Sequence, residues 1–261
     1  MAGHSHAANV KHRKNSVDAK RAKIFSKAAR NIISAVRQAG SEMDTNLKLK
    51  YAVEKARAAN MPKDNILRAI KRGEGAKDGE DFEELVYEGY GPGGVAILIT
   101  CLTDNRNRTA PDIKFALEKG GGNMGSTGSV SFMFDFRSIY VVDMTGEQGA
   151  DGFKGKPFTE DSLLEAGLEA GAEDVQVEGD IATVFAAATE FLGVKTALEE
   201  AGTVMLSAET GYVPQTAVEV PTKDDAAKIL KLIDNLEDNE DVQSVYSNYD
   251  IKDEWLEELN A

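Results

Sequence analysis

Residues 16–39 carry the first regular pattern of apolar side chains in the chain. Apolar residues recur there at spacings of three and four, at Ala22, Phe25, Ala28, Ile32 and Val36. This spacing is typical of an amphipathic helix with one buried face. Ser16 can cap the start of the helix, and Gly40 can end it. The pattern therefore predicts a helix from about Ser16 to Ala39.

Two shorter helices follow in the sequence. The second is predicted to start after Asp44 or Thr45 and to run to about Ala59. The third has Pro62 in its first turn, where the missing backbone N–H breaks no hydrogen bond, and it is predicted to end at Gly73. Three helices joined by short loops indicate a helical bundle.

The pattern changes to strands and helices after a glycine-rich linker at residues 73–79. A buried strand (95–102), a helix (110–119) and an alternating strand (129–136) come first. The next elements follow the order β-α-β-β-α-β of a ferredoxin-like unit; they are 138–143, 159–170, about 175, 181–186, 189–201 and a strand from 204. A strand (217–220), a helix (223–236) and a strand (242–249) complete the pattern.

This order predicts an α+β multidomain protein. We expect a basic arm and three-helix bundle at 1–78, and a discontinuous α+β domain formed by 79–137 and 214–251. A ferredoxin-like domain at 138–213 would be inserted into that domain, and 252–261 would form an acidic tail. No apolar run approaches the roughly 18 residues that a membrane-spanning helix needs.

The charges are distributed very unevenly along the chain. The net charge is −14, yet the residues through Gly75 hold 17 Lys and Arg against 6 Asp and Glu, whereas the remainder holds 13 against 38. Such asymmetry suggests a basic module that meets a polyanion, attached to an acidic body. The alternative is a solvated basic face on a helical bundle.

The candidate nucleic-acid-binding residues are the cations of this basic module and one later cluster. Lysine and arginine on a flexible arm and a helix can follow a phosphate backbone. The candidates in the basic module are Lys11, His12, Arg13, Lys14, Lys20, Arg21, Lys23, Lys27, Arg30 and Lys63. The later cluster contains Asn105, Arg106 and Arg108. It would make either a second contact to phosphate or a helix cap with hydrogen bonds between domains.

Catalytic and metal-binding machinery is hard to find in this sequence. The histidines are His4, His6 and His12, all in the arm, so the body offers none for a catalytic triad. The single cysteine, Cys101, lies in an apolar strand and is expected in the core. One cysteine also excludes a disulfide scaffold and any multi-cysteine metal site. We expect no cofactor, no metal and no enzymatic activity.

Two segments match the pattern G-x-G-x-x-G, one at Gly89, Gly91 and Gly94, the other at Gly120, Gly122 and Gly125. A dinucleotide fingerprint must follow a strand and open a helix, whereas both segments here lead into strands. The context favours glycine-rich turns. A nucleotide-binding or hydrolytic enzyme that uses such a loop is the alternative.

Several stretches together resemble the YebC/PmpR family, which includes the mitochondrial translational activator of cytochrome oxidase subunit I. They are MAGHSHAANVKHRK at the start, DAKRAKIFSKAAR (18–30), NMPKDNILRAIKRGEG (60–75), YEGYGPGGVAI (87–97), TDNRNRTAPD (103–112) and GSVSFMF (128–134). The resemblance covers nearly the whole chain and implies a three-helix bundle with two α+β domains, one ferredoxin-like and inserted in the other. His6-Ala7 replaces the Lys-Trp pair of the family, which removes an aromatic ring that could stack on a base.

The resemblance implies either a DNA-binding transcriptional regulator or a ribosome-associated translation factor that relieves stalling. Lysine and arginine position a protein on nucleic acid more than they read its sequence, and no helix is obviously placed to read a major groove. This favours RNA or the ribosome. We predict a non-enzymatic regulator of gene expression in the bacterial cytoplasm that binds promoter DNA, ribosomal RNA or both, and no membrane. The oligomeric state stays open, and a protein–protein adaptor is a further alternative.

Overall fold

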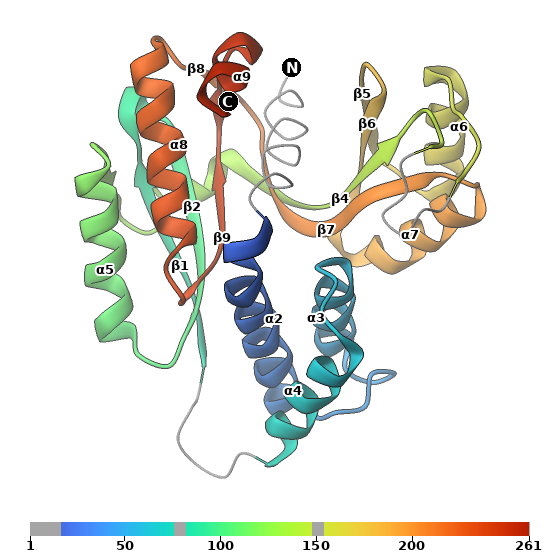
Figure 1. Cartoon of the computed structure of the whole chain (residues 1–261), viewed down its shortest axis with the longest axis horizontal. Helices are drawn as coiled ribbons and strands as arrows, with labels where there is room; N and C mark the ends of the chain where they lie inside the picture. The colour runs from blue at the N-terminus through green and yellow to red at the C-terminus, as the bar shows by residue number, and fades with distance from the viewer. Residues whose placement is uncertain (1–16, 76–81, 148–153, 261) are drawn as a thin grey trace. The chain divides into compact units, whose positions relative to one another are not determined.

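The computed structural model describes residues 17–75, 82–147 and 154–260. The chain forms two compact units, and each is described by itself. Among the described residues, the smaller unit is the continuous stretch 133–217, and the larger unit is formed by the described residues on both sides of it. Figure 1 shows the order of the helices and strands. None of the helices in the described ranges is long and apolar enough to cross a membrane.

Three helices form the bundle of the larger unit: α2 (Val17–Ala39), α3 (Leu47–Ala58) and α4 (Lys63–Gly75). Their apolar faces meet in a core that includes Ile32, Leu49 and Ile66. The predicted bundle is therefore present, and the bounds of α2 agree with the prediction. Ser16, the predicted cap, lies outside the described residues.

Helix α3 starts at Leu47, one residue later than a start directly after Thr45. Asn46 caps this helix, because its side-chain oxygen accepts a hydrogen bond from the backbone N–H of Leu49 at 3.0 Å. The Asn46 amide also donates to the carbonyl oxygens of Ala35 and Gly40. A cap at Asp44 or Thr45 would leave the carbonyl oxygens of Ala35 and Gly40 without the hydrogen bond that the Asn46 amide donates. A buried asparagine thus sets the boundary and ties the end of α2 to the start of α3.

The predicted end of α4 at Gly73 is wrong, because the helix continues to Gly75. Gly73 is buried, and a Cβ atom placed on it would lie 2.7 Å from the Cβ of Val36. The glycine therefore permits close approach of α4 to α2 and does not terminate the helix. Residues 73–75 of the predicted linker are helical, and residues 76–79 lie outside the described part.

The rest of the larger unit is a four-stranded antiparallel sheet covered by two helices. The sheet order is β3-β1-β2-β9, with β1 at Glu83–Tyr90, β2 at Ala96–Thr103, β3 at Asn123–Met124 and β9 at Val242–Ser247. Helices α5 (Arg106–Lys119) and α8 (Lys223–Glu237) lie along one face of this sheet (Figure 1). The shared core includes Ile97 and Ile99 of β2, Ile113 of α5 and Leu232 of α8.

Short elements complete the larger unit. The strands β8 (Val218–Glu219) and β10 (Tyr249–Asp250) form a parallel pair. Residues Pro92–Gly94 form a 3-10 turn, η1. The predicted acidic tail contains a helix, α9 (Asp253–Asn260), whose apolar residues, Trp255 among them, pack against the core of the sheet and helices.

Helix α5 begins four residues earlier than predicted. Asn105 is its cap, and its side-chain oxygen accepts a hydrogen bond from the backbone N–H of Arg108 at 3.2 Å. Pro111 therefore lies inside the helix, where it removes one backbone hydrogen bond, and not in the first turn. The cluster of Asn105, Arg106 and Arg108 therefore forms the capped first turn of this helix.

The smaller unit has the predicted ferredoxin-like order. Its elements are β4 (Phe134–Asp143), α6 (Glu160–Ala170), β5 (Asp174–Glu178), β6 (Ile181–Ala187), α7 (Phe191–Glu200) and β7 (Val204–Pro214). A short 3-10 turn, η3 (Ala188–Glu190), precedes α7. The sheet order is β5-β6-β4-β7, and all neighbouring strands are antiparallel. This is the split β-α-β arrangement, so the α+β multidomain fold is confirmed.

The predicted strand at 129–136 is wrong in its first half. Residues Ser131–Met133 form a 3-10 turn, η2, and β4 starts at Phe134 and continues through the next predicted strand. The buried carboxylate of Glu88 accepts hydrogen bonds from the backbone N–H groups of Val130 and Ser131, at 2.7 and 2.8 Å. These amides are therefore not available to a strand ladder, although the side chains alternate as in a strand.

Candidate nucleic-acid interface

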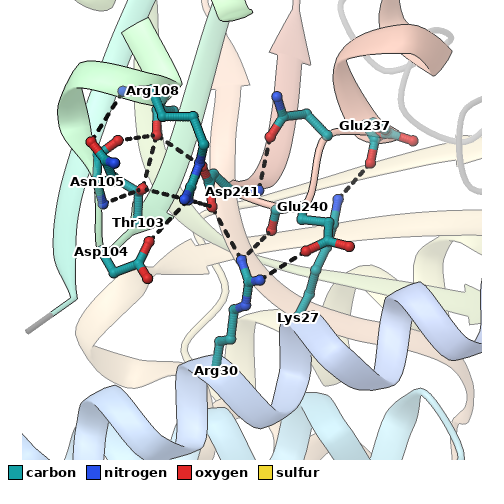
Figure 2. Close-up of polar contacts among 11 residues, drawn as sticks. Lys27, Arg30, Thr103, Asp104, Asn105, Arg108, Glu237, Glu240 and Asp241 are labelled. Atoms are coloured by element: carbon teal, nitrogen blue, oxygen red, sulfur yellow. Dashed lines mark hydrogen bonds and ion pairs between the residues drawn. The ribbon is translucent and has the colours of Figure 1, made fainter. Parts of the chain in front are cut away.

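Three predicted cations lie on one face of α2 and contact the turn between α8 and β9. Lys23, Lys27 and Arg30 are spaced by four and three residues, which places them on one side of a helix. The Lys23 ammonium lies 2.9 Å from the carboxylate of Asp238. The half-buried Lys27 ammonium donates to the backbone carbonyl of Glu237 at 2.5 Å (Figure 2). Burial lowers the pKa of Lys27, and the negative charge of Glu237 partly offsets this.

Arg30 makes the largest set of contacts on this face. Its guanidinium donates to the backbone carbonyl of Glu240 at 3.0 Å and pairs with the Glu240 carboxylate at 3.0 Å. The same guanidinium pairs with Asp241 at 3.2 Å (Figure 2). The α2 cations thus hold both carboxylates and main-chain oxygens of the α8–β9 turn.

The carboxylate of Asp241 joins three elements of the larger unit. Arg108 of α5 places Nη2 2.8 Å from Oδ2 and 2.9 Å from Oδ1, and Thr109 donates to Oδ2 at 2.9 Å. The Asp241 side chain is only 4% exposed. Burial opposes ionisation, but the hydrogen bonds from Arg108 and Thr109 outweigh it, so the pKa of Asp241 is lowered. A charged Asp241 therefore links α2, α5 and the start of β9.

The cluster at 105–108 serves the structure of the larger unit. Asn105 caps α5, and Arg108 pairs with both Asp241 and Asp104, the latter at 2.9 Å. Of the two interpretations of this cluster, the contacts match helix capping. The hydrogen bonds of Arg108 do not join two domains as predicted, because Asp104 and Asp241 belong to the same predicted α+β domain as Arg108. Arg106 is exposed at the start of α5. Contact of the cluster with phosphate stays a prediction.

The structure places the other predicted residues as follows. Lys11, His12, Arg13 and Lys14 lie outside the described residues. Lys20 and Arg21 belong to the first turns of α2. Lys63 is exposed at the first position of α4. Nucleic-acid contact by these residues stays a prediction as well.

Exposed lysines of α3 and α4 form a second cationic set. Apart from Lys63, these lysines were not predicted from the sequence as nucleic-acid-binding residues. Lys50 and Lys55 of α3 and Lys71 of α4 are exposed. Like Lys63, they make no ion pair or side-chain hydrogen bond within the described ranges. We name Lys50, Lys55, Lys63 and Lys71 the free lysines. Their signal in the sequence is their position off the apolar stripe of each helix.

The glycine-rich segments have a packing role. A Cβ atom on Gly122 would lie 2.2 Å from the carbonyl oxygen of Tyr90, and one on Gly89 would lie 2.7 Å from that of Asn123. These glycines therefore allow β3 to lie close against β1. Gly120 likewise leaves room for Leu232 of α8. In the described structure neither segment follows a strand and opens an α-helix, which a dinucleotide fingerprint requires.

Cys101 is a core residue, as predicted. It is buried in β2, and burial raises the pKa of its thiol to about 12. Such a thiol is protonated at neutral pH and is a poor nucleophile. No three histidine, cysteine or acidic residues within the described ranges are grouped so that they could hold a metal ion. The three histidines lie outside those ranges.

Family models and known proteins match nearly the whole chain. The model of the TACO1/YebC protein N-terminal domain matches residues 5–76, and that of the TACO1/YebC second and third domain matches 82–249. A probable transcriptional regulatory protein of Halothermothrix orenii is 48% identical over 99% of both chains. Another, of Geobacter sulfurreducens, is 45% identical over 99% of this chain and 100% of the relative.

A solved structure also matches this fold. The crystal structure of a conserved hypothetical protein from Aquifex aeolicus is 39% identical to this chain. The match covers 91% of this chain and 93% of that one, with a TM-score of 0.78. The similarity therefore extends over both units of the fold.

Proposed function

Since the chain belongs to the TACO1/YebC family, we propose that it regulates gene expression by binding nucleic acid in the bacterial cytoplasm, without catalysing a reaction. The bacterial relatives named above are probable transcriptional regulatory proteins, which supports a regulatory role.

The free lysines are the observation that carries the proposal. Four exposed ammonium groups that have no acidic partner in the described part of the chain stand on two helices of a protein whose net charge is −14. Unpaired lysines on an otherwise acidic protein favour contact with a polyanion, because each phosphate contact releases a condensed counterion. Away from the free lysines, the acidic body would repel nucleic acid. This repulsion would orient the three-helix bundle toward the nucleic acid.

Ribosomal RNA is our first candidate target, and promoter DNA is the second. Lysine contacts position a protein on a phosphate backbone but carry little sequence information. Structured RNA can be recognised by its shape and its phosphates, so lysine contacts suffice there. A promoter requires side chains that read base edges in addition.

The test measures binding of the full chain to ribosomes by co-sedimentation and to duplex DNA by fluorescence anisotropy, at increasing salt. If about six phosphates are neutralised, the logarithm of the binding constant falls with the logarithm of salt at a slope near −5. Reversing three free lysines (Lys50→Glu, Lys55→Glu, Lys71→Glu) should remove most of the binding at about 0.15 M salt. The matched control reverses three exposed lysines elsewhere, Lys114, Lys119 and Lys154.

The outcomes separate the candidates. If co-sedimentation with ribosomes is salt-sensitive and only the free-lysine variant loses it, the result supports a translation factor. Salt-sensitive binding to promoter DNA alone supports a transcriptional regulator. Equal losses in both variants would contradict the assigned surface. Binding to a protein with little salt dependence would indicate an adaptor and would overturn the proposal.

A further inference from the structure

The turn after α8 concentrates negative charge at an unfavourable place. From the last residue of α8 to the residue before β9, four of five residues are acidic, namely Glu237, Asp238, Glu240 and Asp241, and we name residues 237–241 the acidic turn. The C-terminal end of a helix already carries partial negative charge on its free carbonyls, so carboxylates there are destabilising. The last turn of α8 contains no basic residue that could compensate.

The compensation comes from α2. Lys23, Lys27 and Arg30 contact carboxylate oxygens and the backbone carbonyls of Glu237 and Glu240. An array of negatively polarised oxygens within about 3 Å of a row of helix cations is also what a phosphate backbone would offer. The acidic turn therefore occupies the same donors that a polyanion would use.

The contacts are strong at one end and weak at the other. Asp241 is 4% exposed and is held by Arg108 as well as by Arg30. The outer pairs are open to solvent, since the side chains of Asp238 and Glu240 are 55% and 76% exposed. Exposed ion pairs contribute little to stability and are screened by salt, so another anion can replace them.

We propose that the acidic turn is an internal competitor of nucleic acid, which occupies the α2 cations until a phosphate backbone displaces it. This inference rests on the proposed function. The free lysines would make the first contact. Lys23, Lys27 and Arg30 would then exchange the acidic turn for phosphate, and α2 would separate from the α8–β9 end of the sheet. The arrangement favours dense polyanions over isolated phosphates, because several contacts must be replaced together.

The first test neutralises the exposed part of the acidic turn. The variant Asp238→Asn/Glu240→Gln keeps Asp241 and its buried contacts. The control Glu165→Gln/Glu169→Gln removes two exposed charges from α6, so both variants change the net charge equally. We expect the first variant to bind ribosomes or duplex DNA about three- to tenfold more tightly than the control at about 0.15 M salt, since two weak competing pairs are lost.

The second test measures separation directly in the full chain. Spin labels on Ala58→Cys of α3 and Asp112→Cys of α5 report the distance between the bundle and the sheet, and both positions are exposed. The native Cys101 is buried, with its pKa raised to about 12, so it does not compete for the label. Adding the polyanion should shift the distance distribution toward longer values, and a single inorganic phosphate should not.

The outcomes distinguish this inference from the proposed function. If the wild type binds and the acidic-turn variant binds no better than the control, internal competition is wrong while the proposed function stands. Tighter binding with an unchanged distance distribution also overturns the displacement. If neither the wild type nor the variant binds nucleic acid, both proposals fail.

Discussion

Arg108 and Asp241 form a bidentate ion pair, although they lie 133 positions apart in the sequence. Nη2 of Arg108 lies 2.9 Å from Oδ1 of Asp241, and Nε lies 3.2 Å from Oδ2. Such paired hydrogen bonds between charged groups fix orientation as well as distance. Because Asp241 also pairs with Arg30, this contact sets how the bundle meets the sheet within the larger unit.

Asp241→Asn should lower the free energy of unfolding by about 1–3 kcal/mol, as expected for a buried carboxylate whose arginine partners are partly exposed. The amide removes the charge that neutralises Arg30 and Arg108. Urea unfolding followed by circular dichroism measures the change. The control is Asp104→Asn, which removes an exposed partner of Arg108 and should cost less than about 1 kcal/mol. Equal effects of the two variants would contradict the role of Asp241.

Glu88→Gln should destabilise the protein in a pH-dependent way. The buried carboxylate accepts hydrogen bonds from the backbone N–H groups of Gly128, Val130 and Ser131. Burial opposes ionisation, but these bonds outweigh it and lower the pKa of Glu88. A lowered folded pKa contributes stability above the unfolded pKa of about 4.3, and this stability is lost as pH falls through the folded pKa.

The expected loss for Glu88→Gln at pH 7 is about 2–4 kcal/mol, since bonds to a charged acceptor are strong. The difference from the wild type should shrink as the pH falls from the unfolded pKa of about 4.3 through the lowered folded pKa, because the wild-type carboxylate also becomes protonated there. Urea unfolding at pH 7, 5 and 3 measures it. A difference that stays constant across this range would show that the charge of Glu88 is not what anchors the loop.

Gly73→Ala should destabilise the bundle, even though alanine favours a helix by about 1 kcal/mol. The new methyl group would lie 2.7 Å from Cβ of Val36, so α4 must move away from α2. We expect a net loss of about 1–3 kcal/mol in thermal or urea unfolding. At Gly75 a Cβ atom meets nothing within 4 Å. Gly75→Ala should therefore be neutral or stabilising, and a stable Gly73→Ala protein would exclude the close contact.

Charge reversal at Lys20, Arg21 and Lys23 should abolish nucleic-acid binding without unfolding the bundle. Three cations become three acids near the start of α2, and the change replaces attraction to phosphate with repulsion. Of the three, Lys23 is an exposed residue whose ion pair with Asp238 contributes little to folding. Anisotropy measures binding, and circular dichroism confirms the helices. Unchanged affinity would remove these residues from the interface.

Much of the fold could be predicted from local patterns. The three-four spacing of apolar residues predicts the bundle helices, and the order of elements predicts the ferredoxin-like unit. These predictions succeed because the spacing of apolar residues shows which face of a helix or strand is buried. That spacing can be read from residues that are close together in the sequence. The boundaries at Gly73 and at 129–133 were wrong, because there a distant residue, Val36 or Glu88, decides the local conformation.

By itself, the sequence determined the type of most main elements, although not of the strand β1 or the helix α9. It also determined the family resemblance and the separation of a basic start from an acidic remainder. The tertiary structure alone decided which of those charges are already paired. Lys27 and Arg30 carry the same positive charge as the free lysines, yet they contact the main-chain carbonyl of Glu237 and the carboxylate of Asp241, more than 200 positions away. An ion pair depends on distances of a few ångströms that only packing creates, and no local pattern of residues encodes them.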